Sequence, residues 1–340
     1  MSSWLPGAPC TPQDCADPDV PRVAAPLAVL RLTAAMAVLL VGITGAAAVR
    51  PLRPARRAQL TRLWARALVR AFGVRVRVHG GPGPAGGRLV VPNHISWLDV
   101  PLVAAALPSR MLAKSEVRGY PVIGALAARA GTLFIERDRL RALPRTVAGL
   151  ARLLAAGTRV TVFPEGSTWC GRARGRFRPA VFQAALDAGV PVQPVRIDYR
   201  LPDGGLATAP AFVGDDGLGT SLWRVARARG VRAEVRLLPR IPPGRHPDRR
   251  ALARAAQEAV ATAPEPVLGP DLDPGPAPDL DPASEAPASQ APAPGVPAPV
   301  LPAVPRQPAV ASESAKRPAA SVHHCVSSSP AAASSSRTRS

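Results

Sequence analysis

The chain has 340 residues and a formal net charge of +20 at pH 7, from 43 Lys and Arg against 23 Asp and Glu. This length is sufficient for one large domain or two small ones with a substantial core. A strongly basic chain favours anionic partners such as phosphates, acidic lipid head groups or an acidic carrier protein. Aromatic residues make up only 4% of the sequence, and zinc-finger spacings and RNA-recognition motifs are missing from it, which argues against nucleic acid.

Composition divides the chain into four segments. We expect a flexible N-terminus over 1–22, membrane-associated helices over 23–72, a folded domain over 73–263 and a disordered tail over 264–340. The tail is rich in Pro, Ala and Ser and contains few residues that could build a core. Its acidic residues outnumber its basic ones, so the positive charge of the chain belongs to the segments before it.

The four cysteines are Cys10, Cys15, Cys170 and Cys325. They are scattered along the chain, form no C-x-x-C pair and suggest no ligand set with histidine. We therefore expect neither a disulfide scaffold nor a metal site, and a reducing compartment fits this pattern best. Cys170 lies close to a candidate site discussed below, but the sequence offers it no paired base and we interpret it as a bystander.

Residues 32–49 form a run of 18 residues without a charge, which reaches the lower limit for a helix that crosses the hydrocarbon layer. A signal peptide is one alternative, but the run begins more than 30 residues into the chain, after an acidic start. A buried helix of a soluble core is another. The positive charge that follows indicates the cytoplasmic side. The arginines closest to the end of the run are Arg50, Arg53, Arg56, Arg57, Arg62, Arg66 and Arg70.

Residues 60–71 place apolar side chains at helical spacing, with Arg62, Arg66 and Arg70 on another face. This pattern predicts a basic amphipathic helix suited to an anionic membrane surface. A helix packed on the folded domain with a solvated face would look similar. We expect a protein of the cell membrane with its folded domain on the cytoplasmic side, and the sequence leaves both a spanning and a re-entrant helix open.

After Gly73, strand patterns alternate with helix patterns. The expected strands are 74–79, 88–91, 109–114, 131–136, 159–163, 190–197 and 233–238. The expected helices are 98–107, 121–130, 141–156, 179–188, 222–229 and 247–262. This alternation predicts an α/β fold with a mixed, largely parallel sheet flanked by helices. In such sheets, reactive groups gather at the carboxyl ends of the strands.

The stretch NHISWLD at 93–99 lies where an expected strand gives way to an expected helix. The spacing allows Asp99 to accept a hydrogen bond from one ring nitrogen of His94, which leaves the other nitrogen as a general base for a hydroxyl nucleophile. The alternative is that Asn93 and Asp99 cap a helix while His94 packs in the core. Arg137 and Glu165 also follow expected strands, so one crevice could hold them together with His94.

The motif NHISWLD resembles the N-H-x-x-x-x-D block of the glycerolipid acyltransferases, the family that includes the 1-acylglycerol-3-phosphate acyltransferases. Three further blocks follow in the order of that family: GTLFIER at 131–137, FPEGS at 163–167 and VPVQPV at 190–195. The blocks span about a hundred residues, and the resemblance of the surrounding domain extends from about 75 to 240. Four blocks in the family's order form a specific pattern.

The resemblance implies a membrane-bound enzyme that moves a fatty acyl group from acyl-CoA or acyl-carrier protein to lysophosphatidate, giving phosphatidate. His94 would deprotonate the acceptor hydroxyl and Asp99 would orient His94, without an acyl-enzyme, a cofactor or a metal. Another lysophospholipid or a lyso-aminolipid is an alternative acceptor. A membrane lipid-binding scaffold without turnover is an alternative of another class.

By the same resemblance, Arg137 would hold the phosphate of the acceptor, a task suited to the guanidinium fork. Glu165, Gly166 and Ser167 would shape the acceptor site, and Lys114 would be a second phosphate ligand. The alternatives are a surface ion pair for Arg137, an ordinary turn after a buried strand for the FPEGS residues, and a solvated side chain for Lys114.

Two positions depart from the pattern of the family. Its FPEG-containing block usually continues with Arg, whereas here Thr168 and Trp169 follow Ser167. One of the arginines in the stretch CGRARGRF at 170–177 could replace that charge. Pro179 stands where many relatives carry Gly. The first departure makes the head-group preference uncertain at the level of sequence.

Overall fold

The computed structural model describes residues 8–15, 20–129, 131–135 and 140–264. The strands are β1 (Arg75–His79), β2 (Arg88–Pro92), β3 (Arg110–Lys114), β4 (Leu133–Ile135), β5 (Arg159–Thr161), β6 (Val192–Arg200) and β7 (Arg232–Leu237). The α-helices are α1 (Pro12–Cys15), α2 (Ala25–Ala48), α3 (Pro54–Ala71), α4 (Asp99–Ala106), α5 (Pro121–Arg129), α6 (Leu143–Ala155), α7 (Phe182–Asp187), α8 (Leu218–Arg227) and α9 (Arg249–Thr262). Short 3₁₀ turns are η1 (Ser115–Gly119), η2 (Leu140–Ala142) and η3 (Pro179–Val181).

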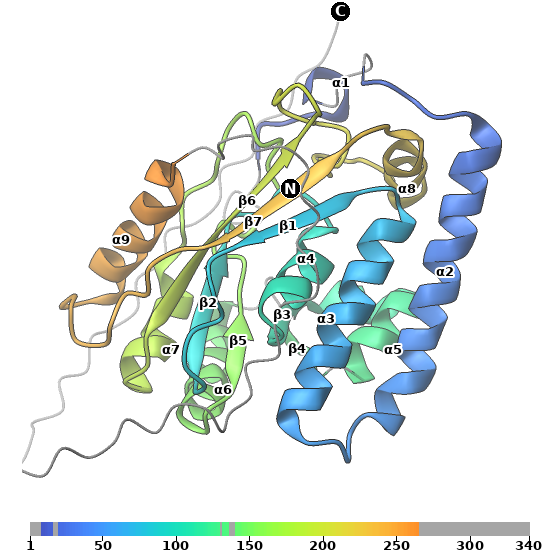
Figure 1. Cartoon of the computed structure of the whole chain (residues 1–340). Coiled ribbons are helices and arrows are strands. Elements are labelled where there is room, and N and C mark those ends of the chain that lie inside the picture. The colour runs from blue at the N-terminus through green and yellow to red at the C-terminus, as the bar shows by residue number, and fades with distance from the viewer. Residues whose placement is uncertain (1–7, 16–19, 130, 136–139, 265–340) are drawn as a thin grey trace, which may run out of the picture. The chain divides into compact units, whose positions relative to one another are not determined.

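Within these ranges seven strands form one sheet, in the order β1-β7-β6-β2-β5-β3-β4. Neighbouring strands run parallel except β6 and β7, which are antiparallel. The predicted mixed, largely parallel sheet with flanking helices is therefore confirmed. Figure 1 shows α6, α7 and α9 on one face of the sheet and α3, α4 and α8 on the other.

The central strand β2 explains why the sheet is covered on both faces. All five of its residues are buried. Leu89 and Val91 point into the core formed with α6, α7 and α9, whereas Val90 points into the core formed with α3, α4 and α8. Successive residues of a strand face opposite sides, so a continuous apolar run is what a doubly covered strand requires.

The N-terminal helices α2 and α3 lie side by side (Figure 1). The indole Nε1 of Trp64 donates to the carbonyl of Val38 at 2.8 Å, and a Cβ added at Gly42 would lie 2.4 Å from that nitrogen. Arg31 ties α2 to the end of α8 by donating to the carbonyls of Ala226 and Ala228 at 2.9 and 2.8 Å. This hairpin therefore packs on the sheet domain through specific contacts.

Helix α2 is long and apolar enough to cross a membrane by length and composition, with a mean hydropathy of 2.2 over its most apolar window. Only 11% of that window is buried within the protein. Its large exposed apolar side chains are Leu27, Val29, Leu30, Met36, Leu40 and Val41. Within the described residues, the protein thus carries an apolar helix surface that the fold leaves uncovered.

Three of the four cysteines, although scattered in the sequence, lie together in the structure. The Sγ atoms of Cys10, Cys15 and Cys170 all lie within 4.8 Å of one another. They meet because the segment around α1 folds back onto the loop that follows β5, a contact between residues about 155 positions apart. Cys325 and nearly all of the expected tail lie outside the described residues.

Candidate active site

The end of β2 is fastened to β6 by one buried amide. Asn93 donates from Nδ2 to the carbonyl of Ile197 at 2.9 Å and accepts from the N–H of Ile197 at 2.8 Å through Oδ1. The amide thus stands in for a backbone unit where the strand pairing ends at Pro92. The alternative reading of Asn93 as a helix cap is therefore wrong, and its actual role is to fix the turn that carries His94.

His94 and Asp99 are joined by the hydrogen bond that their spacing predicts. Nδ1 of His94 lies 2.8 Å from Oδ2 of Asp99, at the first residue of α4. The same oxygen accepts from the N–H groups of Ile95 and Ser96 at 2.6 and 2.8 Å. Asp99 is fully buried, and a buried carboxylate needs such donors to remain charged.

The second oxygen of the Asp99 carboxylate is held by a residue that sequence analysis missed. The hydroxyl of Tyr199, on β6, donates to Oδ1 at 2.7 Å. Burial and the nearby charge of Asp99 raise the pKa of Tyr199 well above its usual value, so its hydroxyl keeps the proton that it donates. With this donor and those of the turn, the carboxylate is fixed in one orientation toward His94.

The imidazole of His94 is also fixed from the side. It stacks on Phe163 with ring centroids 4.0 Å apart and an interplanar angle of 21°. The side chain is 19% exposed. Because Nδ1 is engaged with Asp99, Nε2 is the nitrogen left to meet a substrate at the carboxyl edge of the sheet.

Glu165 supports the backbone around His94. Its Oε2 accepts from the N–H of His94 at 2.9 Å, and its Oε1 accepts from the N–H of Gly175 at 3.2 Å. Burial raises the pKa of Glu165 to about 8, with a further rise from the charge of Asp99 that the two backbone donors oppose. Glu165 is only 3% exposed, so it braces two loops and has little surface left to offer a ligand.

The loop after β5 is shaped to lie against His94. Gly166 has a φ of 77°, a left-handed conformation that costs glycine little. The N–H of Trp169 donates to the carbonyl of His94 at 2.8 Å, and the hydroxyl of Thr168 donates to the carbonyl of Phe212. The residues at the departure from the family pattern are thus structural neighbours of the catalytic candidate. Ser167 lies between them and Gly166, partly exposed.

Two further predicted site residues are not placed beside His94 by the structure. Lys114 is exposed at the carboxyl end of β3, and β5 separates that strand from β2. Arg137 lies outside the described residues. The structure therefore gathers His94, Asp99 and Glu165 with the Gly166–Ser167 turn, and it puts Lys114 two strands away along the same edge of the sheet.

A cavity of about 350 Å³ is lined by the end of β6 and the loop after β5, and four of its lining residues are arginines. Its lining residues are Gly171, Arg172, Arg174, Arg196, Asp198, Arg200 and Leu206. A Cβ added at Gly171 would lie 3.5 Å from the side chain of Ile95, the neighbour of His94. Among these lining residues four arginines outnumber one aspartate, and this excess of positive charge favours an anionic group.

The far end of β6 carries the signal that would have located this cavity. The expected strand stops at residue 197, whereas β6 continues to Arg200 by pairing antiparallel with β7. Along that extension, charged Arg196, Asp198 and Arg200 alternate with the core residues Ile197 and Tyr199. A period of two in charge marks one face of a strand as clearly as a period of two in hydrophobicity.

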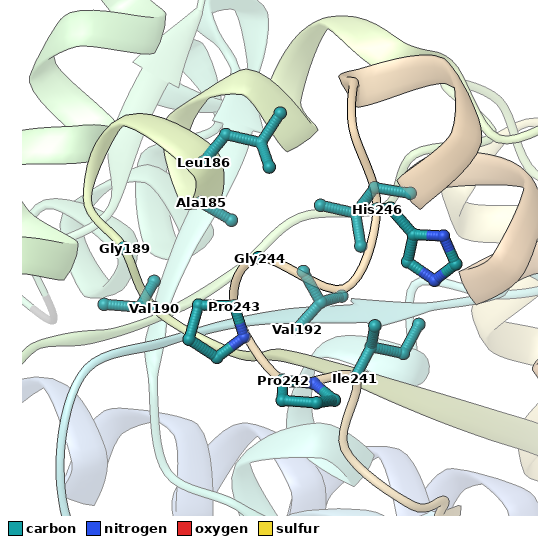
Figure 2. Close-up of a pocket in the computed structure, with 11 residues that line it drawn as sticks. Ala185, Leu186, Gly189, Val190, Val192, Ile241, Pro242, Pro243, Gly244 and His246 are labelled. Atoms are coloured by element: carbon teal, nitrogen blue, oxygen red, sulfur yellow. The ribbon is translucent and has the colours of Figure 1, made fainter.

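A smaller, largely apolar cavity of about 140 Å³ lies at the opposite end of β6, beside its first residue, Val192 (Figure 2). Its walls come from α7 and from the segment that follows β7. His246 is its one titratable lining residue. Because the carboxyl edge of the sheet holds His94, this cavity is separate from the candidate active site.

Comparison with known proteins agrees with this geometry. Residues 75–198 match the family model described as Acyltransferase. The chain is 42% identical over 212 residues to a lyso-ornithine lipid O-acyltransferase of Pseudomonas aeruginosa, covering 61% of this chain and 79% of that protein. It is 34% identical to a 1-acyl-sn-glycerol-3-phosphate acyltransferase of Neisseria gonorrhoeae, covering 53% of this chain and 71% of that protein.

A solved structure shares the fold. The crystal structure of the 1-acyl-sn-glycerophosphate acyltransferase from Thermotoga maritima aligns with a TM-score of 0.51 at 17% identity, covering 69% of this chain and 94% of that one. At this identity the likeness concerns the fold alone, whereas the identities above concern the family. The chain belongs to the acyltransferase family that transfers acyl groups to lysolipids.

Proposed function

We propose that this protein transfers a fatty acyl group from an acyl thioester to the free hydroxyl of a lysolipid, with His94 as the general base. The observation that carries the proposal is the 2.8 Å contact between Nδ1 of His94 and the buried Oδ2 of Asp99. A carboxylate in this position fixes the tautomer that leaves Nε2 basic, and it stabilises the imidazolium that forms when a proton is taken.

The reaction then proceeds by direct transfer. Nε2 of His94 removes the proton of the acceptor hydroxyl as the oxygen attacks the thioester carbonyl carbon. The carbon–sulfur bond breaks, and the leaving thiolate takes the proton back from the imidazolium, so the products are an ester and a free thiol. The base ends each cycle as it began. We propose acyl-CoA or acyl-carrier protein as the thioester, and the basic chain suits the anionic character of both.

The acceptor that we propose first is a lyso-aminolipid of the lyso-ornithine type. The relative from Pseudomonas aeruginosa named for that substrate is 42% identical, against 34% for the relative from Neisseria gonorrhoeae named for the phosphate-bearing substrate. In addition, Thr168 and Trp169 stand where the pattern of the family usually continues with arginine, and both donate hydrogen bonds to neighbouring backbone carbonyls.

Lysophosphatidate is the second candidate acceptor. The cavity lined by Arg172, Arg174, Arg196 and Arg200 favours it, because guanidinium groups bind phosphate through paired hydrogen bonds. Gly171, one of the residues that line it, lies beside the side chain of Ile95, the neighbour of His94. It would accept the carboxylate of an amino-acid head group as well, so the two acceptors must be separated by experiment.

We also propose that the α2–α3 hairpin attaches the enzyme to the membrane that holds its lipid substrates. Helix α2 leaves large apolar side chains exposed, and α3 beside it carries exposed Arg56, Arg57, Arg66 and Arg70. Charged side chains are costly in the hydrocarbon layer but favourable at an anionic surface. This pairing supports a hairpin that lies in the interface on the cytoplasmic side, where its arginines meet acidic head groups.

The test is an acyl transfer assay with purified full-length protein in mixed micelles. Labelled acyl-CoA and acyl-carrier protein are each offered with lyso-ornithine lipid, lysophosphatidate and lysophosphatidylglycerol. We expect product with at least one acceptor, fastest with lyso-ornithine lipid, and its loss in the His94→Ala variant. His246→Ala is the matched control, because His246 lines the cavity at the opposite end of β6.

The other outcomes are equally informative. Preference for lysophosphatidate would select the second acceptor. Binding of lipid vesicles without transfer to any acceptor would indicate a scaffold. A His94→Ala variant with the activity of the unchanged protein would show that another group is the base.

A further inference from the structure

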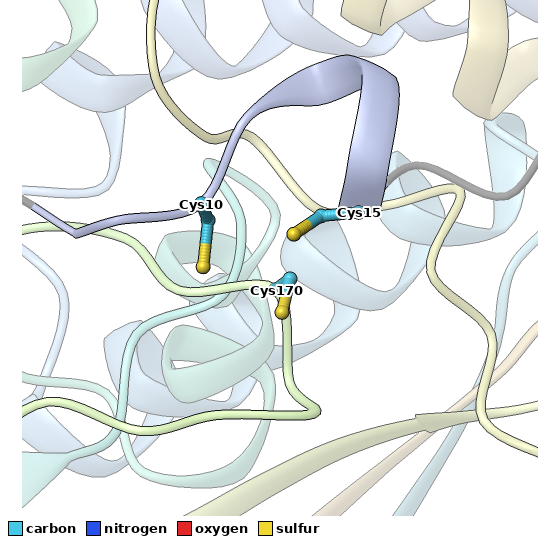
Figure 3. A group of neighbouring side chains, drawn as sticks. All are labelled: Cys10, Cys15 and Cys170. Atoms are coloured by element: carbon cyan, nitrogen blue, oxygen red, sulfur yellow. The ribbon is translucent and has the colours of Figure 1, made fainter.

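The thiols of Cys10, Cys15 and Cys170 form a group that the acyl transfer reaction does not use. Figure 3 shows their side chains gathered from the segment before α1, the end of α1 and the loop after β5. All three Sγ atoms lie within 4.8 Å of one another. Cys10 and Cys170 are buried, and Cys15 is partly buried. Three thiols this close in a shielded position are a ligand set for a soft cation.

The distances suit such a cation. Zn²⁺ binds thiolate sulfur at about 2.3 Å, so two sulfurs on one tetrahedral ion stand ~3.8 Å apart. Small side-chain rotations would bring the three sulfurs, which lie within 4.8 Å of one another, to that separation. The part of the chain that the structure describes contributes three ligands to this group.

The local backbone is built to hold the thiols in this arrangement. The hydroxyl of Thr11 accepts from the N–H of Asp14 at 3.2 Å and donates to the Asp14 carboxylate at 2.6 Å. This pair of bonds starts the single turn of α1, and the N–H of Cys15 closes it by donating to the carbonyl of Thr11 at 3.0 Å. A one-turn helix is too short to persist on its own, so its partners must stabilise it.

The partners belong to loops of the active-site edge. A Cβ added at Gly214 would lie 3.1 Å from the carbonyl oxygen of Cys10, which shows how closely the two segments approach. Arg172 reaches the carbonyl of Asp14 at 3.5 Å. Cys170 directly follows Trp169, whose N–H is bonded to the carbonyl of His94. An ion on the three sulfurs would therefore fasten the N-terminal segment to the loop that abuts the catalytic candidate.

An odd number of thiols favours a cation over a disulfide. One disulfide within the group would use two sulfurs and leave the third as a buried, unpaired thiol. A single ion uses all three. We propose that Cys10, Cys15 and Cys170 bind a thiophilic d¹⁰ cation, Zn²⁺ or Cu⁺, as a structural site that joins the N-terminal segment to the active-site loop.

The test measures metal content in the full-length protein, purified in detergent under reducing conditions. The protein is stripped with chelator, incubated with Zn²⁺, passed over a desalting column and analysed by mass spectrometry of the elements. We expect one Zn²⁺ per chain. We expect Cys10→Ser, Cys15→Ser and Cys170→Ser to lose it, and Cys325→Ser, the matched control, to keep it. A parallel arm with Cu⁺ under anaerobic conditions, competed against Zn²⁺, decides which ion is preferred.

Two measurements on the unchanged protein keep the proposal testable should a serine variant fail to fold. Co²⁺ in place of Zn²⁺ should give a thiolate-to-metal charge-transfer band in the near ultraviolet. Bound Zn²⁺ should protect Cys10, Cys15 and Cys170 from alkylation while Cys325 reacts. Failure to take up either ion, equal uptake by all the serine variants, or a disulfide within the group under reducing conditions would overturn the proposal.

Discussion

The hydroxyl of Tyr199 donates a 2.7 Å hydrogen bond to Oδ1 of Asp99, although the two residues lie 100 positions apart. The carboxylate that orients His94 is therefore held on one oxygen by its own turn and on the other by the extended end of β6. Asn93 reinforces the same link by pairing with Ile197. The geometry of the candidate base thus depends on where β6 lies relative to β2.

Replacement of Tyr199 by Phe tests this dependence. The variant removes one donor from a buried carboxylate, and a hydrogen bond to a charged group contributes about 1.5–3 kcal/mol. We expect the free energy of unfolding to fall by about that amount. We also expect kcat to fall about tenfold, which corresponds to about 1.36 kcal/mol in the barrier, because the carboxylate that orients His94 is held less firmly. KM for the lysolipid should change little, since Tyr199 is fully buried.

Urea denaturation and steady-state kinetics measure the two effects. Tyr120→Phe is the matched control, because Tyr120 is 47% exposed and should tolerate the same change. If Tyr199→Phe lost stability but kept full kcat, Tyr199 would be a purely structural residue.

Glu165 gives a prediction about pH. Its pKa is raised to about 8 in the folded protein, chiefly by burial, against 4.5 as the ordinary value. Between these pH values the folded state binds a proton that the unfolded state has released, so stability falls as pH rises from about 4.5 to about 8 and levels off above it. Below pH 4.5 both states hold the proton, and the slope disappears again.

The Glu165→Gln variant should lack this part of the slope. Other groups titrate in the same window, so the quantity to follow is the difference in Tm between the two proteins across pH 5 to 9. We expect the Tm of the unchanged protein to fall steadily toward that of the variant as the pH rises toward 8. The variant should also be less stable at pH 5, because an amide nitrogen cannot accept from the N–H of His94 or Gly175 in place of a carboxyl oxygen. Parallel pH curves for the two proteins would contradict a raised pKa at this position.

The arginine cavity gives a prediction about substrate affinity. Arg172 lines it, whereas Arg176, from the same stretch of sequence, is exposed outside it. With an anionic acceptor, Arg172→Ala should raise KM about tenfold or more, the cost of one charge-assisted hydrogen bond, and change kcat little. Arg176→Ala should leave both constants unchanged. Equal effects of the two substitutions would place the head group elsewhere.

The sequence predicts the sheet because its strands are either short apolar runs or alternate apolar with polar residues. An apolar run such as LVV in β2 indicates a strand that is buried on both faces. It predicts the pairing of His94 with Asp99 because both belong to one turn. The end of β6 extends beyond the expected strand because it pairs with β7, and the only sign of this in the sequence is the alternation of Arg196, Asp198 and Arg200 with core residues.

Contacts between distant segments are also beyond the reach of local patterns. Nothing in the spacing of Cys10 and Cys170 indicates that α1 folds onto the loop after β5. Tyr199 and Asp99 are likewise matched only in three dimensions. In both cases the residue types are ordinary, and the chemistry arises from which segments the sheet brings together.

The uncovered surface of α2 gives the last prediction. Leu30 and Val41 are 63% and 65% exposed, and their separation of 11 residues places them on one face of the helix. Changing both to Glu should leave the fold intact but put two charges where we expect lipid, at a cost of about 2.5–3.5 kcal/mol each at full depth and less near the surface. Binding to vesicles containing acidic lipid, measured by sedimentation, should fall at least about tenfold.

Ala261→Glu on α9, an exposed position across the sheet, is the control and should bind as before. Undiminished sedimentation of the doubly substituted protein, with an unchanged circular dichroism spectrum, would mean that the apolar face of α2 does not contact the membrane.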